Sequence, residues 1–316
     1  MKDGSLAVEV RDLVKRYGGR PVVDGLSFSV QTGEVFALLG PNGAGKTTTV
    51  EILEGYRRAD AGDVRVLGLD PSRQGAELKS RIGLMLQQGG LFPQITAREA
   101  LRLFAAFYPH AEDPDSLLDL LQLREAANTR FRQLSGGQKQ RLGLALALIG
   151  KPRLVFLDEP TAAMDPQARR STWNIIRDLR NRGTTVLLTT HFMDEAEQLA
   201  NRVAIVDRGR LVALDTPSGL RQAVAQEVRF ATNPYVSEDA VAAALELPRG
   251  VVERENDGTL VVRVEPTPKR IAELTTWLAT QNVLLTELRA GSRSLEQAFL
   301  ALTASDGAEA LTSSAL

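Results

Sequence analysis

The spacing of hydrophobic and polar positions changes several times along this chain, and each change predicts a different kind of element. Residues 35–39 and 154–157 are uninterrupted apolar runs, which are typical of parallel strands buried on both faces. Residues 6–30 alternate instead, with turn signals at Gly18-Gly19 and Asp24-Gly25, and this predicts antiparallel strands. Further strand-like runs are residues 63–67, 81–86, 185–189 and 203–206. Together they indicate an α/β fold with a mixed sheet.

The pattern becomes helical from residue 94 to about residue 132. Thr96 and Glu99 have the spacing of a capping box, and an apolar face follows them. Asp113-Pro114 predicts the start of another helix, with Asp113 as N-cap and Pro114 at the first helical position. We therefore expect a helical insertion, within a helical subdomain of about residues 94–150.

A different order of elements begins near residue 223. The pattern predicts a strand at 227–232, a helix at 237–245, a hairpin around Asn256-Asp257-Gly258, a helix at 268–280 and a strand at 283–288. This β-α-β-β-α-β order is typical of a small α+β ferredoxin-like domain. We therefore expect domains at 1–222 and 223–303, with a small, polar and disordered tail at 304–316.

Composition narrows the function classes. The 38 basic and 39 acidic residues give a net charge of −1, so no strong field favours nucleic acid as a partner. The chain has no cysteine, which excludes disulfides, thiolate metal sites and a cysteine nucleophile. The first residues lack the apolar core of a signal peptide, and the longest apolar run, 142–150, is far short of the roughly 20 residues that span a bilayer. Any membrane role is expected to come through a partner.

The first apolar run leads into a glycine-rich segment that predicts a nucleotide site. Gly40, Gly45, Lys46 and Thr47 fit the pattern G-x-x-x-x-G-K-[ST] between a strand and a helix. Glycines let successive backbone N–H groups surround phosphate oxygens, and the helix adds its positive end. Lys46 would reach the β- and γ-phosphates, and the Thr47 hydroxyl would bind Mg²⁺. The predicted nucleotide-binding residues of this loop are Gly40, Pro41, Asn42, Gly43, Ala44, Gly45, Lys46, Thr47 and Thr48.

The second apolar run ends in two acids. Asp158 follows residues 154–157 directly and would accept a hydrogen bond from Mg²⁺-bound water, while Glu159 would polarise the attacking water. Two exposed acids at a strand end are common in proteins, but a phosphate loop in the same chain favours the catalytic interpretation. An N-K-x-D motif for guanine is absent from the sequence, which argues against a GTPase.

A second anion site precedes the helix that contains residues 142–150. Ser135 and two glycines stand at its start, within Leu134-Ser135-Gly136-Gly137-Gln138. In this segment the chain resembles the ATP-binding subunits of ABC transporters, whose signature is Leu-Ser-Gly-Gly-Gln. The resemblance covers residues 8 to about 221 and implies a P-loop NTPase fold of the ABC type. It also implies that ATP with Mg²⁺ is bound and hydrolysed.

The resemblance assigns further roles. Ser135, Gly136, Gly137 and Gln138 would contact ATP held by a second copy, in a head-to-tail homodimer that Asp165 helps to form. The catalytic group would be Glu159, His191 and Gln87, of which His191 contacts the γ-phosphate. A lone histidine is more often structural, but one at the carboxyl end of a parallel strand faces the ligand crevice. Metal contacts would come from Thr47, Gln87 and Asp158, and Tyr17 would stack on adenine. Gln88 is an adjacent rival of Gln87.

One segment departs from the family pattern, because Ala162-Ala163-Met164 precedes Asp165 where Ser-Gly-Leu is common. The C-terminal portion around Ser294–Thr303 resembles exporter ATPases of the daunorubicin-resistance type. This implies a subunit that powers export of a drug, lipid or polyketide-like cargo, bound through integral membrane permease subunits to the inner face of the cell membrane. The permease would dock near residues 87–97, where Leu91-Phe92-Pro93 is either an exposed contact or packing of the hinge.

Two other functions fit parts of the sequence. A soluble ABC ATPase without a membrane partner is the main alternative, although the chain has no room for a long coiled coil and carries one set of motifs. A regulatory module that binds ATP without hydrolysing it is less well supported, because Glu159 and His191 are both present.

Overall fold

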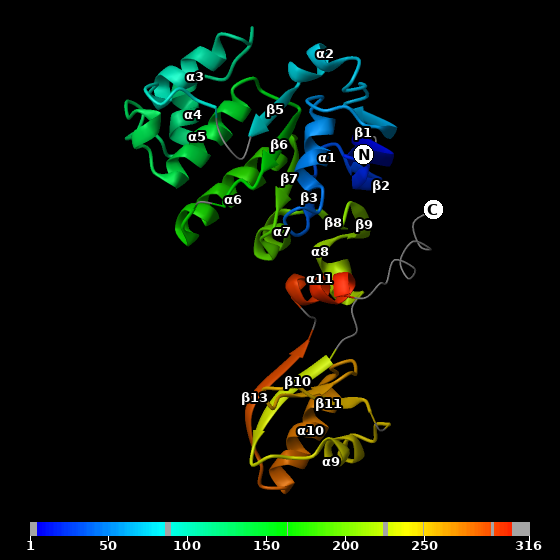
Figure 1. Cartoon of the computed structure of the whole chain (residues 1–316). Helices are drawn as coiled ribbons and strands as arrows, with labels where there is room; N and C mark the ends of the chain where they lie inside the picture. The colour runs from blue at the N-terminus through cyan, green and yellow to red at the C-terminus, as the bar shows by residue number, and fades with distance from the viewer. Residues whose placement is uncertain are drawn as a thin grey trace. The chain divides into compact units, whose positions relative to one another are not determined.

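The computed structural model describes residues 5–85, 90–162, 164–223, 227–248, 250–291 and 294–304. It divides into two compact units, the first ending at Pro217 and the second comprising Ser218–Ser305 (Figure 1). The elements of the first unit are β1 (Leu6–Tyr17), β2 (Arg20–Gln31), β3 (Val35–Leu39), α1 (Lys46–Leu53), β4 (Ala61–Val66), α2 (Gly75–Lys79), β5 (Ile82–Met85), α3 (Ala97–Ala105), α4 (Pro114–Leu120), η1 (Phe131–Gln133), α5 (Gly136–Leu148), β6 (Leu154–Asp158), α6 (Pro166–Asn181), β7 (Thr185–Thr190), α7 (Met193–Leu199), β8 (Arg202–Asp207) and β9 (Arg210–Asp215). Helix α8 (Pro217–Gln222) follows at the division.

The main sheet of the first unit has the strand order β5-β6-β7-β3-β8-β9. Strands β5, β6, β7, β3 and β8 are parallel, and β9 pairs antiparallel with β8. All residues of β3, β6 and β7 are buried, as expected for parallel strands covered on both faces. The mixed sheet predicted from the apolar runs is therefore confirmed.

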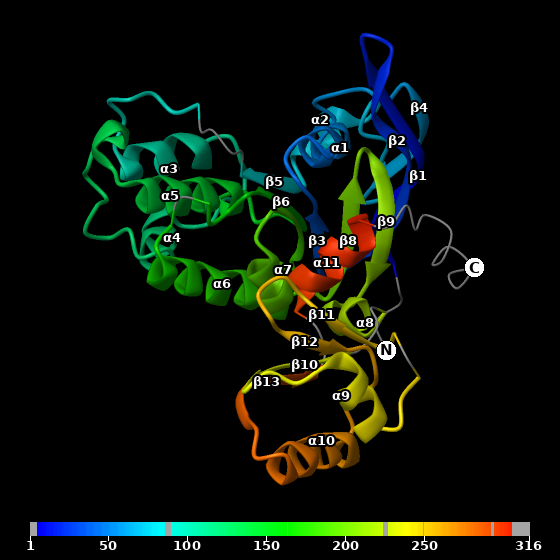
Figure 2. The ribbon, with the colours of Figure 1, turned by 60° about the horizontal axis from the view of Figure 1, so that its bottom comes forward.

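A smaller antiparallel sheet of order β2-β1-β4 lies on one side of the main sheet (Figure 2). The turn at Gly18-Gly19 joins β1 and β2, and both glycines have positive φ. The predicted turn at Asp24-Gly25 is wrong, because both residues lie inside β2. Leu13 pairs with Leu26 and Val14 with Asp24, so Gly25 is the extra residue of a β-bulge, which bends the strand without ending it.

The two sheets and helix α1 share one hydrophobic core. Side chains from β1 and β2 pack with Val50 and Leu53 of α1 against Phe36 and Phe156 of the main sheet. The rings of Phe28 and Phe36 stack with centroids 5.3 Å apart. This core holds α1, and therefore the loop before it, against the end of β3.

The helices α3, α4 and α5 form the expected helical insertion (Figure 2). Thr96 and Glu99 make the predicted capping box at the start of α3. Asp113 caps α4 by accepting from the backbone N–H of Ser116, with Pro114 in the first turn. Among the described residues, no helix is both long and apolar enough to cross a membrane.

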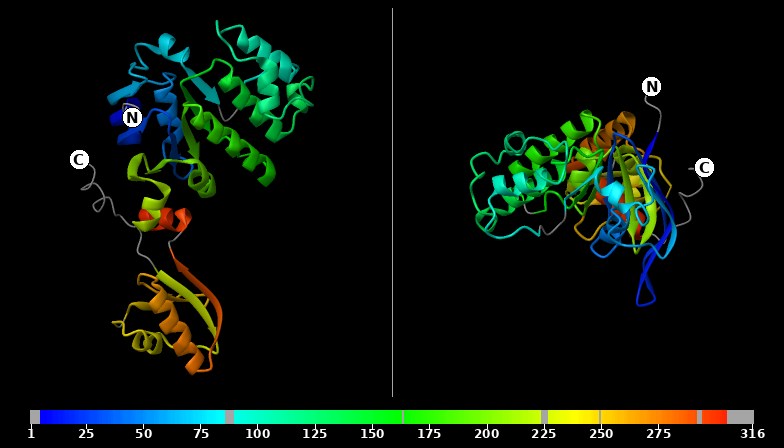
Figure 3. Two further views of the ribbon diagram at one scale, coloured as in Figure 1. Left: turned by 180° about the vertical axis from the view of Figure 1, so that it is seen from behind. Right: turned by 90° about the horizontal axis from the view of Figure 1, so that it is seen from above.

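The second unit contains β10 (Glu227–Asn233), α9 (Glu238–Ala244), β11 (Val252–Arg254), β12 (Leu260–Val262), α10 (Pro268–Thr280), β13 (Leu284–Gly291) and α11 (Leu295–Ala304). Its sheet has the antiparallel order β11-β12-β10-β13. Helices α9 and α10 lie on one face of this sheet (Figure 3). Their apolar residues form a core with Phe230 of β10. The predicted β-α-β-β-α-β order is present. The tail beyond residue 304 lies outside the described residues.

The approach of β5 to α5 depends on one glycine. A Cβ on Gly83 would lie 2.0 Å from the carbonyl oxygen of Ala147. We therefore expect Gly83→Ala to lower the free energy of unfolding by about 1–3 kcal/mol, because the helix must move away from the strand. Gly75→Ala is the control, since its Cβ would meet nothing within 4 Å. Urea unfolding followed by circular dichroism compares the two variants, and equal midpoints would contradict the packing argument.

Candidate active site

Three strands of the main sheet end side by side and bring the predicted chemistry together. Strand β7 lies between β3 and β6, with Leu39 opposite Thr190 and Asp158 opposite Thr189. The residues that follow these strand ends therefore share one edge of the sheet, where parallel α/β folds bind ligands. They are Gly40 after β3, Glu159 after β6 and His191 after β7.

The glycine-rich loop has the shape that its sequence predicts. A Cβ on Gly40 would lie 2.2 Å from the carbonyl oxygen of Val206, and one on Gly45 would lie 2.5 Å from that of Val22. Gly45 is also the N-cap of α1, with φ +98°, a left-handed conformation that favours glycine. Two positions of the loop thus require glycine, and the loop leads directly into the positive end of α1.

Lys46 is held in the concavity of this loop. Its side-chain Nζ donates hydrogen bonds to the carbonyl oxygens of Gly40, at 2.8 Å, and Pro41, at 3.0 Å. Burial lowers the pKa of Lys46, while the charges of Glu159 and Asp158 oppose that shift. The ammonium group therefore faces both acids across the edge of the sheet, ready to bind an anion of high charge.

The two acids at the end of β6, Asp158 and Glu159, are held by Thr189 of β7. The Thr189 hydroxyl donates a hydrogen bond to Asp158, and the Thr189 carbonyl accepts one from the backbone N–H of Glu159, at 3.1 Å. Asp158 is buried, and burial raises its pKa. Glu159 has φ +48°, a strained conformation for a residue with a side chain. Backbone strain of this kind persists only where surrounding contacts maintain it, and it is found most often at functional sites.

Glu159 and His191 are direct partners. The Glu159 Oε1 and His191 Nδ1 atoms lie 3.1 Å apart. The side chain of Glu159 is 11% exposed and that of His191 is 38% exposed. The predicted catalytic pair thus meets at the sheet edge that carries the phosphate loop.

The second predicted anion site is a separate helix start. Ser135 caps α5: its hydroxyl accepts from the backbone N–H of Gln138, and Gln138 Oε1 accepts from the backbone N–H of Ser135 at 2.9 Å. Ser135 and Gly136 are exposed. Among the described residues, no signature side chain makes a hydrogen bond to the phosphate loop of the same chain. Asp165 is also exposed and caps α6, which lowers its pKa.

Two further predicted site residues are Tyr17 and Gln87. Tyr17 lies at the end of β1 and is 41% exposed. The guanidinium carbon of Arg57 lies 5.7 Å from the centre of its ring. Stacking of Tyr17 on adenine stays a prediction. Gln87 and its rival Gln88 lie outside the described residues.

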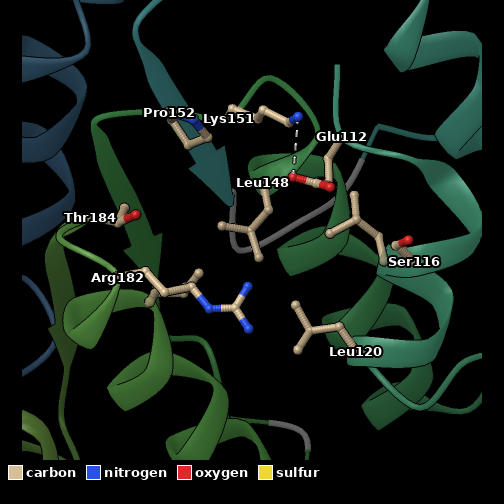
Figure 4. A pocket seen from close by; sticks show the side chains of 10 residues that line it. Glu112, Ser116, Leu120, Leu148, Lys151, Pro152, Arg182 and Thr184 are labelled. Atoms are coloured by element: carbon tan, nitrogen blue, oxygen red, sulfur yellow. Dashed lines mark ion pairs between the residues drawn. The ribbon is translucent and has the colours of Figure 1, made fainter. Parts of the chain in front are cut away.

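A pocket of about 390 Å³ lies elsewhere, between α4, the end of α5 and the end of α6 (Figure 4). Lys151 Nζ and Glu112 Oε2 form an ion pair of 3.7 Å at its rim, and Arg182 points into it. Pro152 and Thr184, which line it, precede β6 and β7. The pocket is therefore at the end of the sheet opposite to the phosphate loop, and it contributes none of the residues described above.

Sequence reasoning missed two residues of the site. Thr189 contacts both acids. It is a polar residue within an apolar strand, two residues before His191, and this position is the sequence signal for its role. Glu54, at the end of α1, is 4% exposed. Burial raises the pKa of Glu54 to about 8, with a further contribution from Asp158. It follows Thr47 by seven residues, which is two helical turns and places both residues on one face of α1.

This fold and this site define an ATP-binding subunit of the ABC transporter class. The family model described as "ABC transporter" matches residues 23–162. A Nod factor export ATP-binding protein I of Paraburkholderia xenovorans (strain LB400) is 39% identical over 278 residues, which is 84% of this chain and 90% of that protein. The chain therefore belongs to the ABC transporter family and is an ABC-type ATPase, which binds and hydrolyses ATP.

Further ATP-binding proteins and solved structures are similar to this chain. Daunorubicin/doxorubicin resistance ATP-binding protein DrrA of Streptomyces peucetius is 34% identical over 304 residues, 94% of this chain and 92% of that protein. A structure of an ATP-binding subunit of an ABC transporter is 27% identical and covers 69% of this chain and 93% of its own, with a TM-score of 0.63. A dimeric, post-hydrolysis ATP-binding cassette bound to ADP and Pi is 26% identical and covers 66% and 98%, with a TM-score of 0.61. The chain is thus similar along most of its length to ATP-binding proteins named for Nod factor export and for daunorubicin resistance.

The buried Glu54 predicts a pH dependence of stability. Its pKa rises from an ordinary value of 4.5 to about 8 on folding, so the native state binds more protons than the unfolded state between these values. The contribution of Glu54 to stability is therefore lost as pH rises from about 4.5 to about 8. We expect Glu54→Gln to match the wild type near pH 4 and to exceed it above pH 8. The upper limit of the gain is about 5 kcal/mol, at 1.36 kcal/mol per pKa unit.

Chemical unfolding at a series of pH values measures this difference. Glu77→Gln is the control, because the Glu77 carboxylate is exposed and pairs with Arg81 at the surface. A constant difference in stability between Glu54→Gln and wild type across the series would show that Glu54 does not take up a proton on folding.

Proposed function

We propose that this ATPase powers a membrane exporter, with two copies closing around two ATP molecules. The observation that carries the proposal is the Glu159–His191 pair, 3.1 Å apart at the sheet edge that holds Lys46 and the phosphate loop. A carboxylate beside a phosphate-binding loop can polarise a water for in-line attack on the γ-phosphate. His191 orients Glu159 and faces the same phosphate.

The phosphate loop supplies the charge stabilisation. Lys46 exchanges its two carbonyl acceptors for β- and γ-phosphate oxygens, which are better partners because they are charged. The negative charge of the phosphates would also oppose the effect of burial, which lowers the pKa of Lys46. Backbone N–H groups of the loop and the start of α1 hold the remaining oxygens.

Mg²⁺ fits the residues present at this edge. The hydroxyl of Thr47 and the carboxylate of Asp158 are oxygen donors, which Mg²⁺ prefers, and burial of Asp158 leaves its negative charge in need of a cation. When bound, the ion would neutralise charge on the β- and γ-phosphates. Gln87 is the further contact proposed for it from the family resemblance.

The exposed start of α5 is the surface that we propose for the second copy. Ser135, Gly136, Gly137 and Gln138 present a capped helix end to solvent, and Asp165 does the same at α6. An exposed helix start can bind a γ-phosphate that a second copy holds from the opposite side. The dimeric cassette with ADP and Pi supports a homodimer here.

The membrane partner is proposed from one exposed segment and from the relatives. Phe92 is 74% exposed, so it contributes to a surface and not to packing of the hinge. Permease subunits docked at Leu91-Phe92-Pro93 would hold the protein at the inner face of the membrane. The relatives named for Nod factor export and for daunorubicin resistance support a drug, lipid or polyketide-like cargo.

The role of Glu159 is tested with two variants that should fail differently. Glu159→Gln is expected to lower kcat by at least about 10²- to 10⁴-fold, because the water loses its base. It should still bind ATP and form a dimer on size-exclusion chromatography. Lys46→Ala should instead weaken ATP binding itself, measured by calorimetry. Wild-type turnover in Glu159→Gln would show that the base is another group.

The membrane partner is tested by co-purification from detergent-solubilised membranes. We expect the wild-type protein to retain an integral membrane permease and Phe92→Asp to lose it, because a charge cannot be buried in an apolar contact. Tyr56→Asp is the control, since Tyr56 is equally exposed, at 76%. A wild-type protein that retains no membrane protein would favour the soluble ATPase.

A further inference from the structure

A buried carboxyl group connects the segment after Glu159 with the helix after His191. Glu195 lies in α7 and is fully buried, with 0% exposure. Its Oε1 accepts a hydrogen bond from the Thr161 hydroxyl, at 2.7 Å, and another from the Trp173 indole N–H, at 3.2 Å. Thr161 is two residues after Glu159, and Glu195 is four residues after His191.

We propose that Glu195 is a positioning residue for ATP hydrolysis, which sets the geometry of Glu159 and His191 through its hydrogen bonds to Thr161 and Trp173. The catalytic pair is joined directly at the 3.1 Å contact between its own side chains. The Thr161–Glu195 bond joins the same two segments deeper in the protein. Trp173 adds the third element, α6, whose first turn follows Asp165.

The location of this group makes a positional role effective. Thr161 and Glu195 are both fully buried, so water cannot compete for the hydrogen bond between them. This bond is therefore stronger than one at the surface, and losing it costs more free energy. Glu159 itself is strained at φ +48°, and strain of this kind persists only where surrounding contacts enforce it. Shifting a catalytic group by about 1 Å can cost about 10²-fold in rate. A small displacement of Thr161 is therefore expected to lower kcat.

The chemistry of Glu195 also defines a conservative variant. Burial raises its pKa, which favours the neutral carboxyl, and hydrogen bonds to Thr190, Thr161 and Trp173 oppose that shift. The Thr161 and Trp173 donors both bind Oε1. The Oε2 atom is buried without a hydrogen-bond partner among the described residues. Glutamine keeps the Oε1 acceptor and replaces a protonated Oε2 with an N–H donor of similar size. Glu195→Gln should therefore preserve the network.

The test measures ATP hydrolysis by the full-length protein. Thr161→Val, which removes the hydroxyl at constant volume, and Trp173→Phe, which removes the indole N–H, are each expected to lower kcat by about tenfold or more, with KM for ATP changed less than about twofold. Glu195→Gln should stay within about threefold of the wild-type kcat. Glu34→Gln is the matched control, because Glu34 is also buried, at 9% exposed, and pairs with Arg202. This pair lies where β3 and β8 begin, at the edge of the sheet opposite to the phosphate loop.

The control separates positioning from stability. Glu34→Gln should lower the melting temperature as Thr161→Val does, yet keep the wild-type kcat. A wild-type kcat in Thr161→Val and Trp173→Phe would overturn the inference, and so would an equal loss of kcat in Glu34→Gln. The inference rests on the proposed role of Glu159, which Glu159→Gln tests in parallel. An inactive Glu159→Gln with a fully active Thr161→Val would refute the role of Glu195 alone.

Discussion

The site depends on the pairing of β7 with its two neighbours, and above all on Thr189. Its hydroxyl holds Asp158 and its carbonyl holds the backbone of Glu159. One residue of the central strand thus orients both acids of the adjacent strand. Since β7 also pairs with β3, the same register brings the phosphate loop and His191 to this edge. Parallel pairing is therefore what converts separate sequence motifs into one site.

Burial of charge follows from that arrangement and sets its electrostatics. Lys46, Asp158 and Glu54 are all less than 10% exposed, and burial disfavours the charged form of each. A buried charge is stable only with a partner. Lys46 and Asp158 offset one another in part, whereas Glu54 adds a like charge beside Asp158 and is better neutral. The negative charge of a bound triphosphate would give Lys46 a further partner.

Much of this could be predicted from the sequence, and the reasons are physical. The phosphate loop and the apolar strands are local patterns, so Gly40–Thr47 and residues 154–157 indicated their structure directly. Glu159 and His191 were found because each follows a strand, but their contact depends on which strands are neighbours. Glu195 and Glu54 were missed, because a single glutamate in an amphipathic helix gives no sign of burial. Asp24-Gly25 forms a bulge where its sequence predicts a turn, since glycine with positive φ is common in both.

The loop from Glu159 to Asp165 shows how the departure at Met164 is accommodated. Met164 is 6% exposed, and its Sδ atom lies 3.1 Å from the Thr172 hydroxyl. A Cβ on Gly137 would lie 3.7 Å from Met164 Cγ, so Met164 packs beside the signature helix of its own chain. An unbranched thioether side chain can fill such an irregular gap. The loop is thus held at Thr161 by Glu195 of α7 and at Met164 by Thr172 of α6.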